Sequence, residues 1–334
     1  MSFSPGLMLT LSRYLAQQAV TFRARFPLVL MLEPTHKCNL ACAGCGRIRE
    51  YRDTLNEMMS AEECLAAARE CGAPVVAVTG GEPLLHPELP AIIHGLTGPQ
   101  KRFVYLCTNG LLLEKTLPRL TPGPRLSLNV HLDGIATSHD AMAGRAGVFD
   151  TAVAGIAAAK AAGFGVCTNT TIYKSTDIAE IRALFDRLTA LGVDGLLVSP
   201  GFDYEAVGED VFLERQEVHQ AFQQIWDLSR RYRLYNTPLY LDFLRGNRPL
   251  QCTPWGNPTR NPRGWKQPCY LITDGHCASF KDLMESTDWS RYGNGRDPRC
   301  AHCMVHSGFE ATVVRQVMRS PAAMLQMARW SLFS

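Results

Sequence analysis

Short apolar runs alternate with longer amphipathic stretches along the first two thirds of the chain. The apolar runs predict strands at residues 28–32, 75–78, 103–107, 125–132, 164–171 and 195–199. Helical spacing predicts helices at residues 87–96, 148–162 and 178–191, and one more that opens at Ser60, where Ser60 and Glu63 form a capping box. Six such βα units in a row imply an all-parallel sheet with helices outside.

Six units in place of eight predict an α/β fold, a partial (β/α)6 TIM-like barrel whose chemistry lies at the carboxyl ends of its strands. After about Tyr235 the pattern breaks, because proline and glycine become frequent and cysteines return. The chain therefore divides into an amphipathic helical segment (1–27), the barrel (28–235), a small cysteine-rich domain (236–314) and an amphipathic basic tail (315–334).

The two ends of the chain are apolar and basic. Residues 3–25 fit an amphipathic helix with arginines between its apolar positions, and the tail from Arg315 has a similar composition. Such a segment either docks on its own barrel or rests on a membrane surface, which would suit extraction of a hydrophobic substrate. Both readings stay open from the sequence.

Composition narrows the function classes. The net charge of +3 is too small to indicate a nucleic-acid partner. Twelve cysteines without a cleavable signal peptide indicate a reducing compartment and metal sites, so we expect a cytoplasmic protein, with any membrane contact peripheral and on the inner face. No apolar run reaches the length of a membrane span.

Three cysteines directly follow the first predicted strand. Cys38, Cys42 and Cys45 have the spacing C-x3-C-x2-C, and closely spaced thiolates suit an iron–sulfur cluster. The fourth iron would lack a protein ligand and could chelate an amino acid's amine and carboxylate. The alternatives are a zinc site, with a fourth ligand such as His36, or a run of buried free thiols.

A glycine pair follows the second predicted strand. Gly80 and Gly81 at this strand end would let the backbone approach a ligand closely, and Glu82 supplies a carboxylate that could receive an ammonium group. Alone, this sequence fits an ordinary turn. Because this sequence lies one βα unit after the cysteine motif, it predicts a ligand site.

Together the two motifs resemble the radical S-adenosylmethionine superfamily over residues 28–204. The resemblance implies a [4Fe-4S] cluster on the three cysteines, which reduces S-adenosylmethionine and gives methionine and a 5′-deoxyadenosyl radical. It also implies that Gly80, Gly81 and Glu82 hold the methionyl amine. The usual aromatic residue before the third cysteine is absent, since Gly44 stands there, and this puts the adenine contact in doubt.

Polar residues end several predicted strands and should face the same rim of the barrel. They are Asn109, His131, Asp133, Asn169 and Ser199. Of these, Asn109, Asp133 and Asn169 are candidates for the ribose and carboxylate of S-adenosylmethionine, and Ser199 is a further binding candidate. Each would also fit a helix cap or a turn.

A narrower resemblance extends over residues 26–314. Phrases such as GGEPLLHP, FVYLCTNGLL and DWSRYGNGRDPRCAHCM resemble the adenosylhopene synthases of bacterial hopanoid biosynthesis. This resemblance implies that the deoxyadenosyl radical adds to the terminal double bond of diploptene, a hydrophobic triterpene. The enzyme would draw electrons from a low-potential donor such as flavodoxin or ferredoxin.

The carbon radical left on the hopane would need a hydrogen atom and an electron. A thiol is a suitable donor because S–H is weaker than C–H, and Cys107 at the end of the third strand is the best-placed thiol. Its alternative is a buried core cysteine, a role that suits Cys64, Cys71 and Cys167 better.

Four later cysteines form a two-plus-two set: Cys252, Cys269, Cys300 and Cys303. The set resembles the small twitch domain of some superfamily members, in which four cysteines ligate a second [4Fe-4S] cluster. Residues 270–277 would form its hairpin, with Asp274 and Gly275 as turn residues. Zinc or free thiols are the alternatives, and Ser307 excludes a further cysteine ligand.

Two rivals to hopene adenosylation remain from the sequence. The first is a radical reaction on another alkene, a sugar or a peptide, which a polar pocket would favour. The second is a non-catalytic iron–sulfur electron carrier or zinc-stabilised binding module, which would not cleave S-adenosylmethionine.

Overall fold

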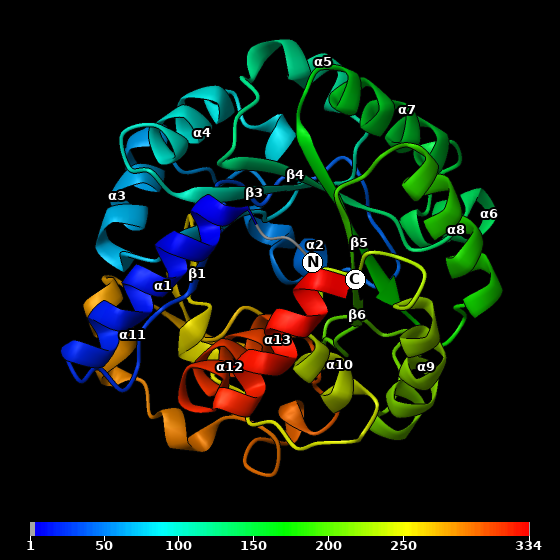
Figure 1. The fold of residues 1–334 in the computed structure, drawn as a ribbon. Helices are drawn as coiled ribbons and strands as arrows, with labels where there is room; N and C mark the ends of the chain where they lie inside the picture. The colour runs from blue at the N-terminus through cyan, green and yellow to red at the C-terminus, as the bar shows by residue number, and fades with distance from the viewer. Residues whose placement is uncertain (1–3, 334) are drawn as a thin grey trace.

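The structure, a computed structural model, describes residues 4–333 (Figure 1). Its centre is a curved sheet in which six strands run parallel and neighbour one another in chain order. These are β1 (Val29–Leu32), β2 (Val75–Val78), β3 (Phe103–Thr108), β4 (Leu126–His131), β5 (Gly165–Ile172) and β6 (Gly195–Pro200). The predicted partial barrel of six βα units is confirmed, and each predicted strand lies within one residue of its observed bounds.

Helices cover the outside of this sheet and form an arc around it (Figure 1). The described helices in chain order are α1 (Pro5–Val20), α2 (Gly46–Glu50), α3 (Ala61–Cys71), α4 (Leu89–Thr97), α5 (Leu113–Thr116), α6 (Ala136–Ala143), α7 (Val148–Ala161), α8 (Ile178–Ala190), α9 (Arg215–Leu228), α10 (Pro238–Leu244), α11 (Phe280–Ser286), α12 (His306–Arg319) and α13 (Pro321–Phe333). Of these, α3 to α9 form the arc, whereas α2 lies near the centre of the view. The predicted capping box of Ser60 and Glu63 opens α3. Cys64 and Cys71 of α3 are buried in the main core, as predicted.

Alternate residues of the parallel strands separate two environments. Leu106 of β3 and Leu128 of β4 belong to the core between sheet and helices. Their neighbours Cys107 and Asn129 point to the opposite face, which lines the barrel interior, and the two lie side by side in register. The interior of the barrel is therefore partly polar and carries thiols.

The sheet continues on the other side of β1 into the C-terminal part of the chain. There β7 (Thr259–Asn261) pairs parallel with β1, and β8 (Gly264–Pro268) and β9 (Thr273–Cys277) follow antiparallel. The predicted hairpin at residues 270–277 is wrong, since Asp274 and Gly275 lie inside β9 and not in a turn. The carboxylate of Asp274 is held instead by Arg299 and by the hydroxyl of Tyr292.

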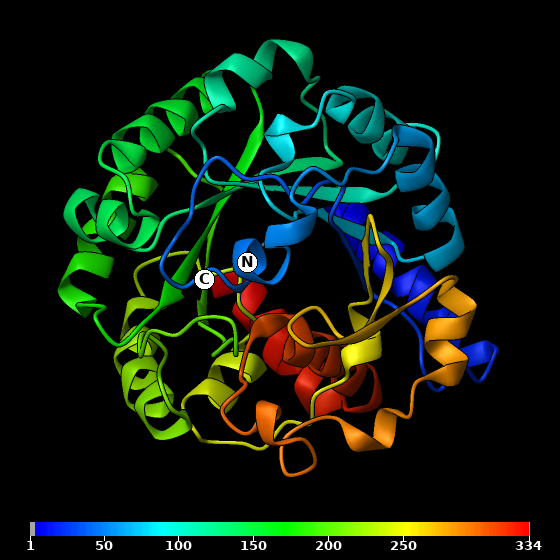
Figure 2. The same cartoon turned by 180° about the vertical axis from the view of Figure 1, so that it is seen from behind.

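The terminal helices lie together on one end of the barrel. Figure 1 shows α1 and α13 in front, whereas the loop that leads into α2 is in front in Figure 2, which views the molecule from behind. The helices therefore cover the amino-terminal ends of the strands, opposite the cysteine loop. Within residues 4–333, no helix combines the length and apolar character needed to cross a membrane.

Candidate active site

The first cysteine motif forms a loop between β1 and α2, at the carboxyl end of β1. Cys38, Cys42 and Cys45 are all half-buried, and Cys45 is the residue that caps α2. Arg49 of α2 reaches back and donates from Nη1 to the carbonyls of Cys42 (2.9 Å) and Cys45 (2.8 Å). This arginine, which the sequence did not single out, holds the second half of the loop closed.

The three sulfurs share one electrostatic environment. Burial raises the pKa of Cys38 to about 11 and that of Cys42 to about 12, and the neighbouring thiols add to both shifts. Buried thiolates therefore need a cation. Among the described residues, no three His, Cys, Asp or Glu side chains lie close enough together to hold a single metal ion. Three thiols on one short loop suit an iron–sulfur cluster, and this stays a prediction.

His36, the alternative zinc ligand, has contacts through its ring face and Nδ1, whereas its Nε2 is buried without a hydrogen-bond partner among the described residues. Its ring stacks on Tyr51 with the centroids 3.9 Å apart, and Nδ1 lies 3.1 Å from the hydroxyl of Thr54. Burial lowers the pKa of His36, so the ring is held neutral in an aromatic stack. These contacts give His36 a structural role.

The glycine pair after β2 packs against the cysteine loop itself. Gly80 has φ +109°, and a Cβ there would lie 2.6 Å from the carbonyl oxygen of Thr35. A Cβ on Gly81 would lie 2.1 Å from the carbonyl oxygen of Lys37. The amides of Gly81 and Glu82 donate to these same two carbonyls at 3.0 and 2.8 Å. The close approach that requires glycine is thus made to the cysteine loop, whereas the sequence suggested only an approach to a ligand.

Glu82 is buried and already carries three hydrogen bonds. Its carboxylate accepts from the amide of Leu84 (3.0 Å), the hydroxyl of Thr108 (2.8 Å) and the amide of Asn109 (2.9 Å). Burial nevertheless raises its pKa to about 7, although these hydrogen bonds oppose the shift. The carboxyl group therefore joins the ends of β2 and β3 and is poised between its charged and neutral forms.

Asn109 links the end of β3 to the cysteine loop. Its Nδ2 donates to Oδ1 of Asn39 at 2.8 Å, and its Oδ1 accepts from the amide of Leu111. Because Asn39 directly follows Cys38, the structure brings Asn109 into the cysteine site, as predicted from its place at a strand end.

Asp133 and Asn169 meet through His131. The His131 ring lies 2.8 Å from Oδ2 of Asp133 through Nε2 and 3.2 Å from Nδ2 of Asn169 through Nδ1. Although burial opposes both charges, the pKa of Asp133 is lowered and that of His131 is raised, because each stabilises the other's charge. Oδ1 of Asn169 is buried without a hydrogen-bond partner, so this row retains a free acceptor.

Ser199 is separate from that row. Its hydroxyl donates to the carbonyl of Pro200 and accepts from the amide of His306 at 3.5 Å, where α12 begins. The side chain is buried. These contacts direct Ser199 toward the C-terminal helices.

Cys107 lies in the barrel interior, one strand from Asn129. Nδ2 of Asn129 approaches its sulfur at 3.6 Å. Burial raises the pKa of Cys107 to about 11, with the Glu82 carboxylate adding to the shift, so the thiol keeps its proton at neutral pH. Cys167 follows in the same row, because Asn129 pairs with Cys107 on one side and with Cys167 on the other.

Two tyrosines close over the third cysteine. A Cβ on Gly44 would lie 2.7 Å from the ring and hydroxyl of Tyr173, and a Cβ on Gly46 would lie 2.2 Å from the ring of Tyr204. Tyr173 follows β5 and Tyr204 follows β6, so both reach the loop from distant parts of the chain. The glycine at position 44 thus makes room for an aromatic ring from another strand.

The four later cysteines line one pocket. Cys252, Cys269, Cys300 and Cys303 surround about 500 Å³ of atom-free space that is partly open to solvent. Burial raises the pKa of Cys252, and the other three thiols raise it further. Ser307 lines the same pocket. The structure thus brings the four cysteines to one pocket, and their role as ligands of a metal centre stays a prediction.

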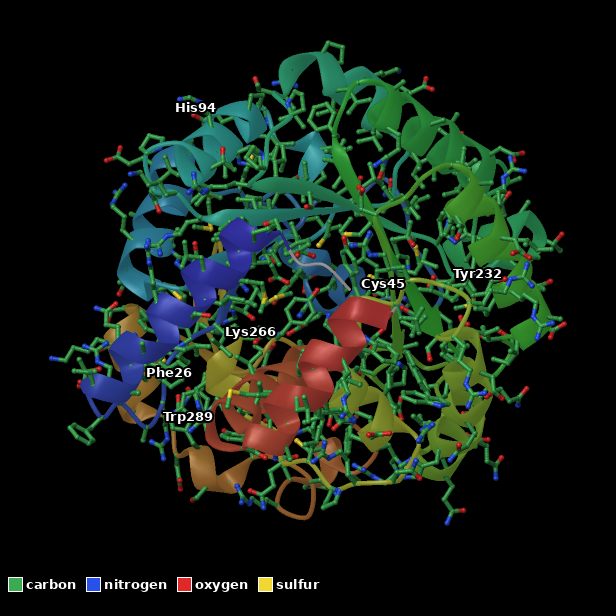
Figure 3. The ribbon with its side chains drawn as sticks, in the orientation of Figure 1. Phe26, Cys45, His94, Tyr232, Lys266 and Trp289 are labelled. Carbon is green, nitrogen blue, oxygen red and sulfur yellow. The ribbon has the colours of Figure 1, made fainter. Side chains whose placement is uncertain are left out.

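A buried ion-pair network, the Arg47 network, connects the two cysteine sites. Nε of Arg47 lies 3.0 Å from Oε1 of Glu33, and Nη1 lies 3.0 Å from Oε2 of Glu50. Arg47 also donates to the carbonyl of Tyr270 and lies 4.1 Å from the centre of its ring. Lys266 of β8, labelled with Cys45 in Figure 3, donates to the same carbonyl at 3.0 Å. The network joins Cys45 and Cys269 through residues one or two positions away from each.

Two family models match the chain. The model described as "Radical SAM superfamily" matches residues 32–188, and the one described as "Domain of unknown function (DUF3463)" matches residues 196–327. The first match contains the cysteine loop and the glycine pair. The second contains all four later cysteines.

Two curated relatives are similar to this chain. Fe-coproporphyrin III synthase of Methanosarcina barkeri is 31% identical over 211 residues, which cover 61% of this chain and 52% of that protein. A probable GTP 3′,8-cyclase of Methanococcus maripaludis is 26% identical over 279 residues, which cover 78% of this chain and 91% of that protein.

Solved structures share the fold. Streptococcus suis SuiB has a TM-score of 0.66 at 14% identity, covering 91% of this chain and 78% of that one. The structure titled "Native anSMEcpe with bound AdoMet" has a TM-score of 0.57 at 15% identity, covering 92% of this chain and 97% of that one. At these identities the likeness concerns the fold.

Replacing Gly81 with alanine should displace the cysteine loop. The added Cβ would meet the backbone of Lys37, which cannot move without breaking the hydrogen bond from the Glu82 amide to the Lys37 carbonyl. We therefore expect a loss of about 3 kcal/mol in unfolding free energy. Iron bound after anaerobic reconstitution should fall in parallel. Gly123→Ala is the matched control, because its Cβ would meet nothing within 4 Å. Equal iron content in both variants would contradict the role of the glycine.

Replacing Arg47 with methionine should destabilise the chain by about 3–5 kcal/mol, because it leaves the carboxylate of Glu33 buried without a partner. Urea unfolding would measure the change. The double variant Arg47→Met with Glu33→Gln should recover part of the loss. Arg52→Met, whose side chain is 79% exposed, is the control and should change stability little. A loss no larger than the control's would rule out a structural role for the Arg47 network.

Proposed function

We propose that this chain, whose residues 32–188 match the radical S-adenosylmethionine superfamily model, is an adenosyl transferase of hopanoid biosynthesis. It would add the 5′-deoxyadenosyl group to the terminal double bond of a hopene such as diploptene. The observation that carries the proposal is the position of the Cys107 thiol inside the barrel, beside Asn129 of the neighbouring strand. The resemblance of its FVYLCTN stretch to adenosylhopene synthases adds to it.

The residues around the cysteine loop fit the superfamily's cofactors. Cys38, Cys42 and Cys45 would hold the [4Fe-4S] cluster, which when bound supplies the electron that cleaves S-adenosylmethionine to methionine and a 5′-deoxyadenosyl radical. Burial raises the pKa of Glu82 to about 7, so its carboxyl group would ionise when the methionyl ammonium lies beside it. Oδ1 of Asn169, a buried acceptor without a partner, fits a ribose hydroxyl.

Aromatic and acidic groups complete that binding surface. Tyr173 packs where a side chain at position 44 would lie, so it is our candidate for the adenine contact that Gly44 does not make. Asp133 is held charged by His131 and offers a second fixed acceptor at the same rim. Asn109, bonded to Asn39, would set the position of the loop beside the bound cofactor.

Cys107 would complete the reaction. Bonding of C5′ to the terminal carbon of the alkene leaves an unpaired electron on the tertiary carbon of the hopane. Transfer of a hydrogen atom from the Cys107 thiol to that carbon forms the C–H bond and leaves a thiyl radical. One electron from a low-potential donor such as flavodoxin or ferredoxin, with one proton, restores the thiol. Its raised pKa keeps the hydrogen atom on sulfur before this step.

A polar substrate is the second candidate. The inner face of the barrel carries Ser127, Asn129 and His131, which are half-buried and in a row along β4. The curated relatives are named for reactions on a porphyrin and a nucleotide. A sugar or nucleoside substrate would use these side chains where a triterpene would not.

Incubation with diploptene, S-adenosylmethionine and a low-potential reductant tests the choice. Mass detection of an adenosylated hopane supports the proposal. Cleavage of S-adenosylmethionine without this product favours the polar substrate. Absence of any cleavage by protein with its full iron content favours a non-catalytic electron carrier or binding module.

The variant Cys107→Ala should still cleave S-adenosylmethionine but should lose at least most of the saturated product, since no thiol remains to quench the hopane radical. Cys167→Ala, a thiol in the same interior row, is the matched control and should keep the product. Product yield and 5′-deoxyadenosine would be quantified together by mass spectrometry. Unchanged product yield from Cys107→Ala would refute the donor role.

The later cysteines give a prediction of their own, because we propose that they hold a second [4Fe-4S] cluster. Replacing both Cys300 and Cys303 with serine should remove half of the iron and sulfide of the reconstituted chain. The control Cys277→Ser should retain all of it, since its sulfur lies beside Ser286 and not in the pocket. Retained iron in the double variant, or zinc in the purified protein, would exclude the second cluster.

A further inference from the structure

The two ends of the chain are net positive because they contain no acidic residue. Residues 1–32 and 311–334 contain six of its 34 Lys and Arg and none of its 31 Asp and Glu. The whole chain has a net charge of only +3, so the part between these segments is net negative. The net positive charge of the chain therefore lies in its two terminal segments.

The same segments carry most of the exposed apolar surface. Among the described residues, the large hydrophobic side chains that stand exposed are Met8, Leu9, Val20, Phe22, Met324, Leu325 and Met58. All but Met58 belong to the two terminal segments, and Phe22 and Val20 are 93% and 76% exposed. Isolated exposed hydrophobic residues are ordinary, but five on α1 and α13, with Phe22 directly after α1, mark an interaction surface.

Helix α1 presents two distinct faces. Leu7 and Leu15 are buried against the barrel, whereas Leu9, Arg13 and Val20 follow one another at helical spacing on the exposed side. The helix is fixed in this orientation by Tyr14, whose hydroxyl donates to the carbonyl of Pro27 at 2.6 Å. The outward face of α1 is thus apolar and basic, whereas its inward face is packed against the barrel.

A hydrogen bond joins the two ends of the chain, and a ring stack holds α13 on the barrel. Arg315 of α12 donates to the carbonyl of Ala24, just after α1, at 2.7 Å. Trp330 of α13 stacks on Trp226 of α9 with the ring centres 5.5 Å apart. Both terminal helices therefore lie on the amino-terminal face of the barrel, opposite the cysteine loop (Figures 1 and 2).

We propose that this face, formed by α1, residues 21–25 and α13, docks peripherally on an anionic lipid bilayer. Apolar side chains would enter the headgroup region, and arginines on the same surface, such as Arg13 and Arg23, would attract anionic lipids. A second copy of this chain is a poorer occupant, because a symmetric contact would oppose arginines to arginines without an acidic residue from either segment. The proposal does not depend on hopene adenosylation, although a bilayer is where a triterpene would be held.

Vesicle sedimentation with the full-length, reconstituted chain tests the proposal. We expect the chain to sediment with vesicles of phosphatidylcholine and phosphatidylglycerol, and at least about fivefold less with phosphatidylcholine alone. Raising the salt concentration should release it, because exposed charges are screened. Absence of sedimentation with anionic vesicles, or equal sedimentation with both kinds, would overturn the proposal.

Surface variants locate the contact. Arg13→Gln and Arg23→Gln should each weaken binding about fivefold, and the double variant Leu9→Glu with Phe22→Glu should abolish sedimentation. Arg52→Gln and Met58→Glu, exposed residues outside the terminal segments, are the matched controls and should bind as the unchanged chain does. Circular dichroism should be the same for all variants, since each changed residue is exposed.

Two results would place the contact elsewhere. If the controls weaken binding as much as the terminal variants, the terminal face is not the lipid surface. If the chain does not sediment with vesicles, and sedimentation velocity shows a dimer that is lost in the double variant Leu9→Glu with Phe22→Glu, the face binds a second copy.

Discussion

The buried ion pair between Glu33 and Arg47 is the constraint on which the cysteine site depends. These two residues flank the three cysteines of the first motif, so their 3.0 Å contact closes the base of that loop. Glu33 is wholly inaccessible to solvent, and a buried carboxylate without a partner would be very costly. The position of the thiols therefore follows from the position of a charge pair that the barrel cannot release.

The same arginine makes the C-terminal strands part of the site. Arg47 and Lys266 converge on the carbonyl of Tyr270, directly after Cys269, and Glu50 accepts from both cations. Two cations and two carboxylates share one buried space, so each neutralises another and none is left alone. The two cysteine sites are consequently coupled: a change in the charge held at one would be felt by ion pairs that position the other.

Much of the barrel followed from local pattern. The β-branched and apolar runs at residues 75–78 and 195–199 predicted strands because a buried parallel strand reads as a continuous apolar segment. The cysteine and glycine motifs were visible for the same reason, since their chemistry lies in adjacent residues. The strands β7 to β9 were missed, although Asn261-Pro262-Arg263-Gly264 is a turn sequence, because their few residues show no clear alternation.

The local sequence pattern could not predict contacts between distant segments of the chain. Arg47 meeting Tyr270, and Tyr173 covering Gly44, join residues that only the closed barrel brings together. The reason for Gly80 and Gly81 was misjudged for the same cause, since the backbone they approach belongs to a loop more than forty positions earlier. Asp274 and Gly275 show the converse, because they have a strong turn signal but lie in β9, where Gly275 pairs with Gln267 of β8.

The two ends of the barrel differ in the charged groups that they carry. The carboxyl ends of the strands collect buried carboxylates, such as Glu33 and Glu82, and the half-buried thiol of Cys38. The amino-terminal end carries arginines in segments that contain no acidic residue, together with exposed apolar side chains. Because the two sets lie on opposite faces, a bilayer bound by one would leave the cysteine loop facing away from it, open to an electron donor.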